Sequence, residues 1–188
     1  MARLCILRED FLLELYGITN DQIERLDDNH GAYRRNYFWR NSLRTLEEIR
    51  GVMNGLGSET TFRVAMEKDA EVRVAFEDAK RALNKASEEF LVFLRNKVGA
   101  HVDEAWIQTA LNSMDPQQEG YIQVGEMTGE THYKFALEVL WSALLHDVPK
   151  EAALEEIESL LEKSARLTSA IGAIDKVVFS YFKDRKLP

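Results

Sequence analysis

The feature of this sequence that most constrains its fold is an apolar repeat of three and four residues that continues over long stretches. The repeat is clearest between residues 72 and 94, where its members are Val72, Phe76, Ala79, Leu83, Ala86, Phe90, Phe93 and Leu94. This spacing places the side chains on one face of an α-helix, whereas a strand would alternate apolar and polar residues. Only three of the 188 residues are proline, so few positions force a helix to end. The pattern predicts an all-α protein.

The same repeat and its interruptions predict the individual helices. They are a short helix over about 8–16 that stops at Gly17, a long helix from the capping region 19–21 to about Leu56, a second long helix from 58–61 to about His101 with an interruption near 68–69, a shorter helix over 104–113, a helix over about 132–146, and a last long helix from 147–149 to about Lys183. Short polar residues at the expected starts can cap the unpaired backbone N–H groups. Glycines at the expected ends favour helix termination.

Long helices joined by short breaks predict an up-and-down helical bundle of antiparallel helices, formed by one domain over residues 1–188. The segment 120–133 contains three glycines beside Tyr121, Ile122 and Val124, which predicts a loop or a small hairpin. The helix over 132–146 is apolar nearly all round, so we expect it deep in the core.

The charge balance restricts what the protein can bind. The net charge is −8 and the isoelectric point is about 5.1, which argues against a broad, sequence-independent nucleic-acid binder. A small local cationic site remains compatible with this charge. The single cysteine, Cys5, excludes an intrachain disulfide and fits a reducing compartment. No stretch approaches the roughly 20 apolar residues of a membrane span, so we expect a cytoplasmic protein without membrane association.

The stretch FLRNKVGAHVDE, residues 93–104, carries the residues best suited to chemistry. Arg95 offers a fixed cation for a phosphate, and Asn96 can position the phosphate or a neighbouring side chain. His101 titrates near neutral pH and can act as a general acid or base on a ribose 2′-hydroxyl. Arg95 and His101 are six residues apart and would point about 120° apart on a regular helix. Gly99 could bend the helix between them, or a twofold dimer could bring two copies together.

The order arginine, polar residue, four residues and histidine resembles the motif of HEPN domains, the higher eukaryotes and prokaryotes nucleotide-binding superfamily. That resemblance covers Arg95 to His101 within an all-helical chain. It implies a dimeric helical bundle and a metal-independent endoribonuclease of a defence or toxin–antitoxin system. Arg95, Asn96 and His101 would then be the catalytic residues, RNA the substrate, and an antitoxin a protein partner. No cofactor is implied.

A second interpretation assigns the same residues structural roles. Arg95 would pair with a nearby acid, His101 would bond the last helix carbonyls, and the protein would be a non-catalytic helical interaction protein. Metal binding is not expected, because Asp27 and His30 have no matching ligand pair of the type that bundle metal sites use.

One further segment is locally basic. Residues 32–50 carry five arginines with interleaved aromatic residues, a composition that suits either RNA contact or arginines that pair with acids elsewhere. Arg40 and Arg44 lie one helical turn apart. They could join the Arg95 site if the first two long helices pack antiparallel.

Overall fold

The computed structural model describes residues 1–20, 28–94, 96, 104–117, 119–124 and 132–183. Its helices are α1 (Ala2–Thr19), α2 (Asp28–Ser58), α3 (Thr60–Met66), α4 (Ala70–Ala86), the π-helical turn η2 (Ser87–Leu91), α5 (Val92–Leu94), α6 (Glu104–Ser113), α7 (Lys134–Leu144), the 3₁₀ turn η5 (Lys150–Ala152), α8 (Ala153–Arg166) and α9 (Thr168–Lys183). Two short strands, β1 (Ile122–Gln123) and β2 (His132–Tyr133), complete the described elements. The predicted all-α helical bundle is confirmed.

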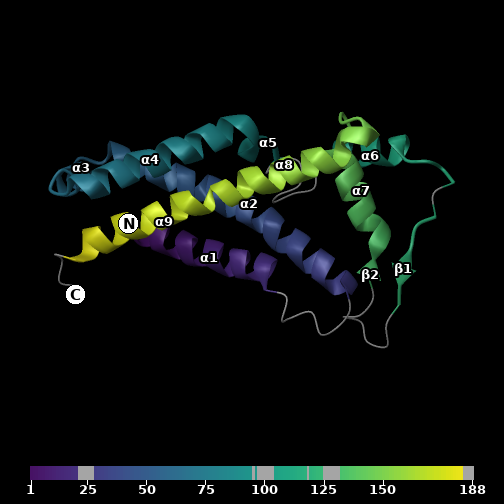
Figure 1. Ribbon diagram of the computed structural model, residues 1–188, viewed down its shortest axis with the longest axis horizontal. Helices are drawn as coiled ribbons and strands as arrows, with labels where there is room; N and C mark the ends of the chain where they lie inside the picture. Colours follow the sequence, from purple (N-terminus) through teal and green to yellow (C-terminus); the bar gives the residue numbers. More distant parts are fainter. Residues whose placement is uncertain (21–27, 95, 97–103, 118, 125–131, 184–188) are drawn as a thin grey trace.

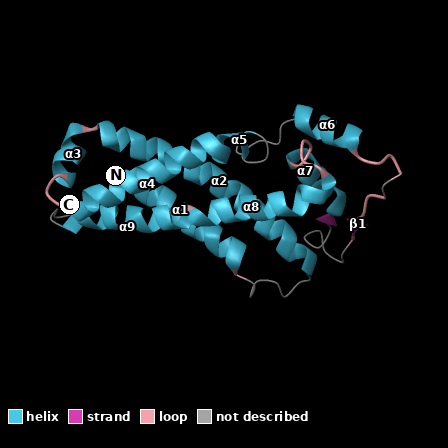
Figure 2. Ribbon diagram, turned by 45° about the horizontal axis from the view of Figure 1, so that its top comes forward, coloured by secondary structure: helices cyan, strands magenta, loops and turns pink. Residues whose placement is uncertain are grey.

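Helices α1, α2, α4 and α9 form a four-helix bundle (Figures 1 and 2). Helices α1 and α2 run antiparallel, because the Arg34 guanidinium donates to the Gly17 carbonyl at one end and Arg3 pairs with Glu48 towards the other. Helix α9 runs back along α1, so the two chain ends lie at the same end of the molecule (Figure 1). The connectivity is therefore up and down, as predicted.

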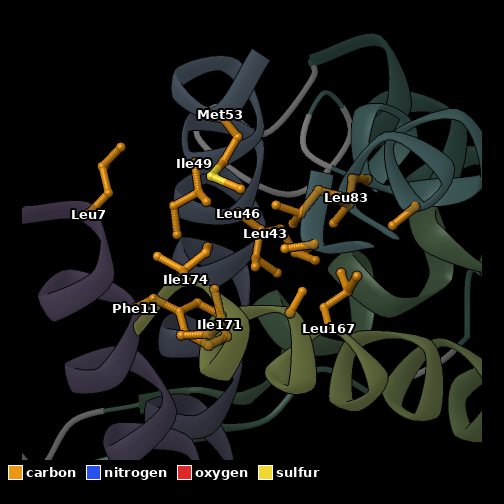
Figure 3. Close-up of a cluster of buried hydrophobic side chains, with 14 of the residues drawn as sticks. Leu7, Phe11, Leu43, Leu46, Ile49, Met53, Leu83, Leu167, Ile171 and Ile174 are labelled. Carbon is orange, nitrogen blue, oxygen red and sulfur yellow. The ribbon is translucent and has the colours of Figure 1, made fainter. Parts of the chain in front are cut away.

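The core lies between these four helices (Figure 3). Its fully buried side chains come from every one of them and include Leu4, Leu43, Leu46, Ile49, Met53, Leu83, Ile174 and Val177. Removing this much apolar surface from water is the main stabilising contribution to such a fold. The interruption predicted near 68–69 is also present, because the Asp69 carboxylate accepts from the backbone N–H groups of Glu71 and Val72 and caps α4.

Helices α6 and α7 and the hairpin lie at the far end of the molecule from the chain termini (Figure 1). Ile122 pairs with Tyr133 and Gln123 with His132 in an antiparallel ladder, so the hairpin alternative for residues 120–133 is confirmed. Helices α6 and α7 share a second, smaller cluster around Ala110, Val139 and Ala143. Helix α7 also reaches the main core, through Leu140 and Leu144.

Three expectations from the sequence are wrong. Gly17 does not end the first helix, because α1 continues to Thr19. The last long helix is divided at Leu167 into α8 and α9. Helix α7 is not buried all round, because Phe135 at its start is 40% exposed. Apolar periodicity finds the face that can be buried but does not say which neighbour covers it.

Gly17 is required by a close helix crossing. A Cβ atom added at Gly17 would lie 2.3 Å from the Phe38 ring of α2, far inside van der Waals contact. By contrast, a Cβ atom at Gly51, which lies on the exposed side of α2, would meet nothing within 4 Å. Alanine substitutions at Gly17 and Gly51 therefore distinguish the effect of an added methyl group on packing from its effect on helix propensity.

We expect Gly17→Ala to lower the free energy of unfolding by about 1–3 kcal/mol, the usual cost of overpacking. Gly51→Ala is the matched control and should raise it by about 0.5–1 kcal/mol, because alanine loses less backbone entropy than glycine in a helix. Urea denaturation of both variants measures the two effects. A Gly17→Ala variant as stable as Gly51→Ala would contradict the close contact with Phe38.

Glu14 is a buried carboxyl group between α1 and α2. Its Oε1 accepts a hydrogen bond from the Thr45 hydroxyl at 2.8 Å, while Oε2 is buried and has no hydrogen-bond partner among the described residues. Burial raises the pKa of Glu14 to about 7, against the opposing effects of Thr45 and Arg44. The folded protein consequently binds a proton at this site more tightly than the unfolded chain does.

Because the folded-state pKa is raised, Glu14 should favour the folded state at acidic pH and lose that effect as the pH rises from about 4.5 to about 7. We expect the stability of the parent protein relative to Glu14→Gln to fall by roughly 2 kcal/mol across this window. Chemical denaturation of both proteins between pH 4.5 and 8 measures the difference. Parallel pH profiles would show that the carboxyl group is solvated in the folded protein.

Candidate functional site

The residues of the predicted catalytic motif are only partly described. Arg95 and His101 lie outside the described residues, as does Gly99. Asn96 follows α5 and is exposed to solvent. Whether Arg95 and His101 converge therefore stays a prediction, and the described surroundings of the segment carry the structural argument.

The motif segment connects α5 to α6 along the chain, and the described residues on its two sides are close together. The ring of Phe93 in α5 packs edge to face on the ring of Trp106 in α6, with centroids 5.5 Å apart. Such an aromatic pair contributes packing energy beyond the area that it buries. Asn96 therefore follows a helix whose end is held against the start of α6.

Two hydrogen-bonded amides set the register between α2 and α4. The side-chain amides of Asn54 and Asn84 exchange two hydrogen bonds, at 2.9 and 3.2 Å. Arg50 of α2 also donates to the Asn84 side chain, at 3.4 Å. Leu43 and Leu94 also belong to the same buried cluster. The antiparallel packing expected for these helices is thus present.

The two arginines considered with the motif have different surroundings. Arg44 is exposed, and its Nε atom lies 4.0 Å from the Glu48 carboxylate. Arg40 is half-buried and lines a cavity of about 640 Å³ between α2, α6 and α7. Arg40 and Arg44 therefore do not serve one common surface.

The cavity has a polar side and an apolar side. Helix α2 contributes Tyr33, Asn36, Tyr37 and Arg40, which recur at the i, i+3, i+4 and i+7 positions of one helix face. Helices α6 and α7 contribute the apolar residues Ile107, Leu111, Phe135, Ala136, Leu137, Val139 and Leu140. Volumes of this size are typical of small-molecule pockets, and an apolar lining with a few convergent polar groups is their usual chemistry.

Asn36 is the most deeply placed polar residue of the cavity. Its side chain is 8% exposed, and Nδ2 has no hydrogen-bond partner among the described residues. Leaving a buried amide N–H unbonded costs about 1–3 kcal/mol. This nitrogen is closed to solvent, so it is packed inside the protein and does not face the cavity.

Burial also changes the two titratable groups on either side of Asn36. It lowers the pKa of the Arg40 guanidinium, because a cation loses hydration there, and the nearby Tyr37 opposes this only in part. Burial raises the pKa of Tyr33, and the negative charge of Glu138 raises it further. The two ends of this stripe of α2 therefore differ: the Arg40 cation is partly desolvated, and the Tyr33 hydroxyl lies within the influence of Glu138.

Sequence reasoning missed this cavity, although part of its signal was present. The spacing of residues 33, 36, 37 and 40 places them on one face, yet only the arginines and aromatics were noticed and Asn36 was not. The apolar surplus of α7 was interpreted as complete burial. In the structure, apolar residues of α7 between Phe135 and Leu140 line the cavity.

Among the described residues, no group of three or more histidine, cysteine, aspartate or glutamate side chains is placed to hold a metal ion. Among the helices in the described ranges, none combines the length and apolar character needed to cross a bilayer. Comparisons with protein-family models, curated proteins and solved structures find no match.

The buried amide of Asn36 and the partly buried amide of Asn84 should respond oppositely to replacement by leucine. Asn36→Leu removes an unbonded donor, so we expect the free energy of unfolding to stay the same or rise by about 1 kcal/mol. Asn84→Leu deprives Asn54 of its partner and should lower it by about 1–3 kcal/mol. Urea denaturation distinguishes the two. A large loss in Asn36→Leu would mean that Nδ2 is bonded in the folded protein.

Proposed function

We propose that the protein is a metal-independent endoribonuclease resembling the HEPN superfamily. His101 acts as the general acid or base on the ribose 2′-hydroxyl or the leaving oxygen, Arg95 binds the scissile phosphate, and Asn96 positions it. The enzyme belongs to a defence or toxin–antitoxin type of system, acts in the cytoplasm as a homodimer, and has a protein antitoxin as partner.

The observation that carries this proposal is the position of Asn96 in an antiparallel helical bundle. Asn96 is exposed directly after α5, where a substrate can reach it. The ring of Phe93 in α5 packs on the ring of Trp106 in α6, so the two helices that flank the motif segment are held together. The side chain proposed to position the phosphate is therefore accessible, next to two helix ends that are in contact.

A second candidate function is a non-catalytic interaction protein. It is favoured by large apolar side chains on the outer surface of α1 and α9: Ile6, Leu13 and Tyr16 are each more than half exposed, and Phe179 is 73% exposed. Exposed apolar side chains that cluster on one surface are characteristic of protein contacts. This candidate predicts association with a partner and no RNA cleavage.

RNA cleavage by the purified protein in the presence of a metal chelator tests the proposal. We expect the parent protein to cleave and His101→Ala and Arg95→Ala each to lower the rate by about 10² or more, the usual contribution of a general acid–base group or of an oxyanion-binding group. Circular dichroism confirms that both variants are folded.

The matched controls are His146→Ala and Arg81→Ala, which remove an exposed histidine and an exposed arginine that are not part of the motif. Both should cleave like the parent protein. Cleavage that survives His101→Ala and Arg95→Ala would overturn the proposed site. A parent protein that cleaves none of a varied set of RNAs would favour the interaction protein.

A further inference from the structure

We infer that the C-terminal part of α1, residues 12–19, is a proton-dependent latch on α2. The latch is closed while the buried Glu14 side chain carries a proton, and it opens locally when that side chain ionises. Opening uncovers the surface of α2 around Phe38 and Thr45, which the closed latch covers. This inference concerns a conformational change of the bundle and does not rest on ribonuclease activity.

The N-terminal half of α1 is held to the bundle by large apolar side chains. Those that it buries in the core are Leu4, Leu7 and Phe11. In the same half, Arg8 donates to both carboxylate oxygens of Asp175 in α9, at 2.6 and 2.9 Å. Glu14 follows six residues later, about 9 Å further along the helix. Apolar burial is the main stabilising contribution in such a bundle, so this half of α1 stays attached when the other half opens.

The C-terminal half of α1 is held differently. Its buried residues are Glu14 and Gly17, and neither of them buries a large apolar side chain. The Gly17 carbonyl accepts a hydrogen bond from the Arg34 side chain at 2.7 Å, and Leu15 and Ile18 pack against the core only in part. The attachment of this half to α2 therefore depends on the state of the Glu14 carboxyl group.

The surroundings of Glu14 suit a neutral carboxyl group better than an ionised one. The residue is 8% exposed, and its Oε1 accepts a hydrogen bond from the Thr45 hydroxyl at 2.8 Å. Its Oε2 is also buried and has no hydrogen-bond partner among the described residues. An ionised carboxylate can accept about four hydrogen bonds, so one hydroxyl donor replaces little of the hydration that it loses here.

The charges that act on Glu14 do not compensate for this loss. Arg44 of α2 attracts an ionised Glu14, but its side chain is half exposed and lies 4.0 Å from the Glu48 carboxylate. Asp10 of α1 and Glu48 of α2 both repel it. On the side of α9, the Asp175 carboxylate is bound by Arg8. Ionisation thus places a poorly compensated charge between α1 and α2.

Opening should therefore depend on pH in a defined range. Burial raises the pKa of Glu14 to about 7 in the closed latch, whereas an opened latch returns the pKa towards its ordinary value of 4.5. Proton binding favours the closed latch at acidic pH, and this effect is lost as the pH rises through about 7. Between pH 5 and pH 8 we expect the equilibrium constant for opening to rise by about 10- to 100-fold.

Hydrogen–deuterium exchange of the full chain between pH 5 and pH 8 tests the inference, with each rate divided by the intrinsic rate of an unprotected amide at that pH. Residues that leave α2 lose the packing that stabilises a short helix, so their amides exchange. We expect the protection of residues 12–19 to fall by about 10- to 100-fold and to be lower than that of residues 2–11 at every pH.

Low concentrations of urea distinguish local opening from unfolding of the whole protein. About 1 M urea should hardly change the protection of residues 12–19, because local opening exposes little surface, and should lower that of residues 70–86 in α4. Equal protection of the two segments with equal urea dependence would overturn the inference, because Glu14 would then act only through global unfolding. Protection of residues 12–19 that does not change with pH would also overturn it.

Three variants connect the pH dependence to the Glu14 side chain. Glu14→Gln should make the protection of residues 12–19 independent of pH, because the amide does not ionise. Glu9→Gln is the matched control, since it changes an exposed acid of the same helix, and it should keep the pH dependence of the parent protein. Thr45→Val removes a donor to the ionised carboxylate, so it should increase opening at pH 8 more than at pH 5. The same pH dependence in Glu14→Gln as in the parent protein would show that another group controls the opening.

Discussion

The amide pair of Asn54 and Asn84 fixes how α2 lies against α4, and the positions of the other elements along α2 depend on that register. Apolar stripes alone allow two helices to slide by a turn at modest cost, because leucine packs against leucine in either register. A hydrogen-bonded pair of amides resists such a slide, because a shift leaves two partly buried amide groups unbonded. The Arg50 side chain adds to this by contacting Asn84 and pairing with the buried Glu47. These polar contacts make one register preferable to its neighbours.

In that register, the two halves of α2 contact different parts of the molecule. Its C-terminal half packs in the four-helix core through Leu43, Leu46, Ile49 and Met53 (Figure 3). Its N-terminal half contributes Trp39 to that core, and its other faces contact different parts of the molecule. Arg34 and Phe38 meet α1 at Gly17, whereas the face carrying Asn36 and Arg40 lines the cavity. Trp39 lies between these faces and stacks on Trp141 of α7 at 5.7 Å. A single helix thereby joins the core to the outlying end of the molecule.

Much of the fold could be predicted from the sequence because helix periodicity and capping are local properties. Asp69 caps the start of α4 through its own side chain, and the pattern at 104–113 coincides with α6. Gly17 was misinterpreted because its role is non-local: it admits the Phe38 ring from another helix, which no neighbouring residue reveals. The cavity was missed for the same reason. Asn36 is unremarkable in sequence, and only the packing of α7 against α2 makes its amide buried and unbonded.

Because the chain is acidic, the strength with which it attracts an anion depends on how deeply the nearby arginine is buried. With a net charge of −8, the field at long range repels anions, but salt screens that field beyond about 8–10 Å. Inside that distance, the local dielectric decides the strength of an interaction, and a desolvated guanidinium attracts an anion more strongly than an exposed one. Arg44 is exposed beside an acid, whereas Arg40 is half-buried against apolar walls. Exposed cations such as Arg44 suit a substrate that brings many charges of its own, whereas the partial burial of Arg40 strengthens its interaction with any charge held close to it.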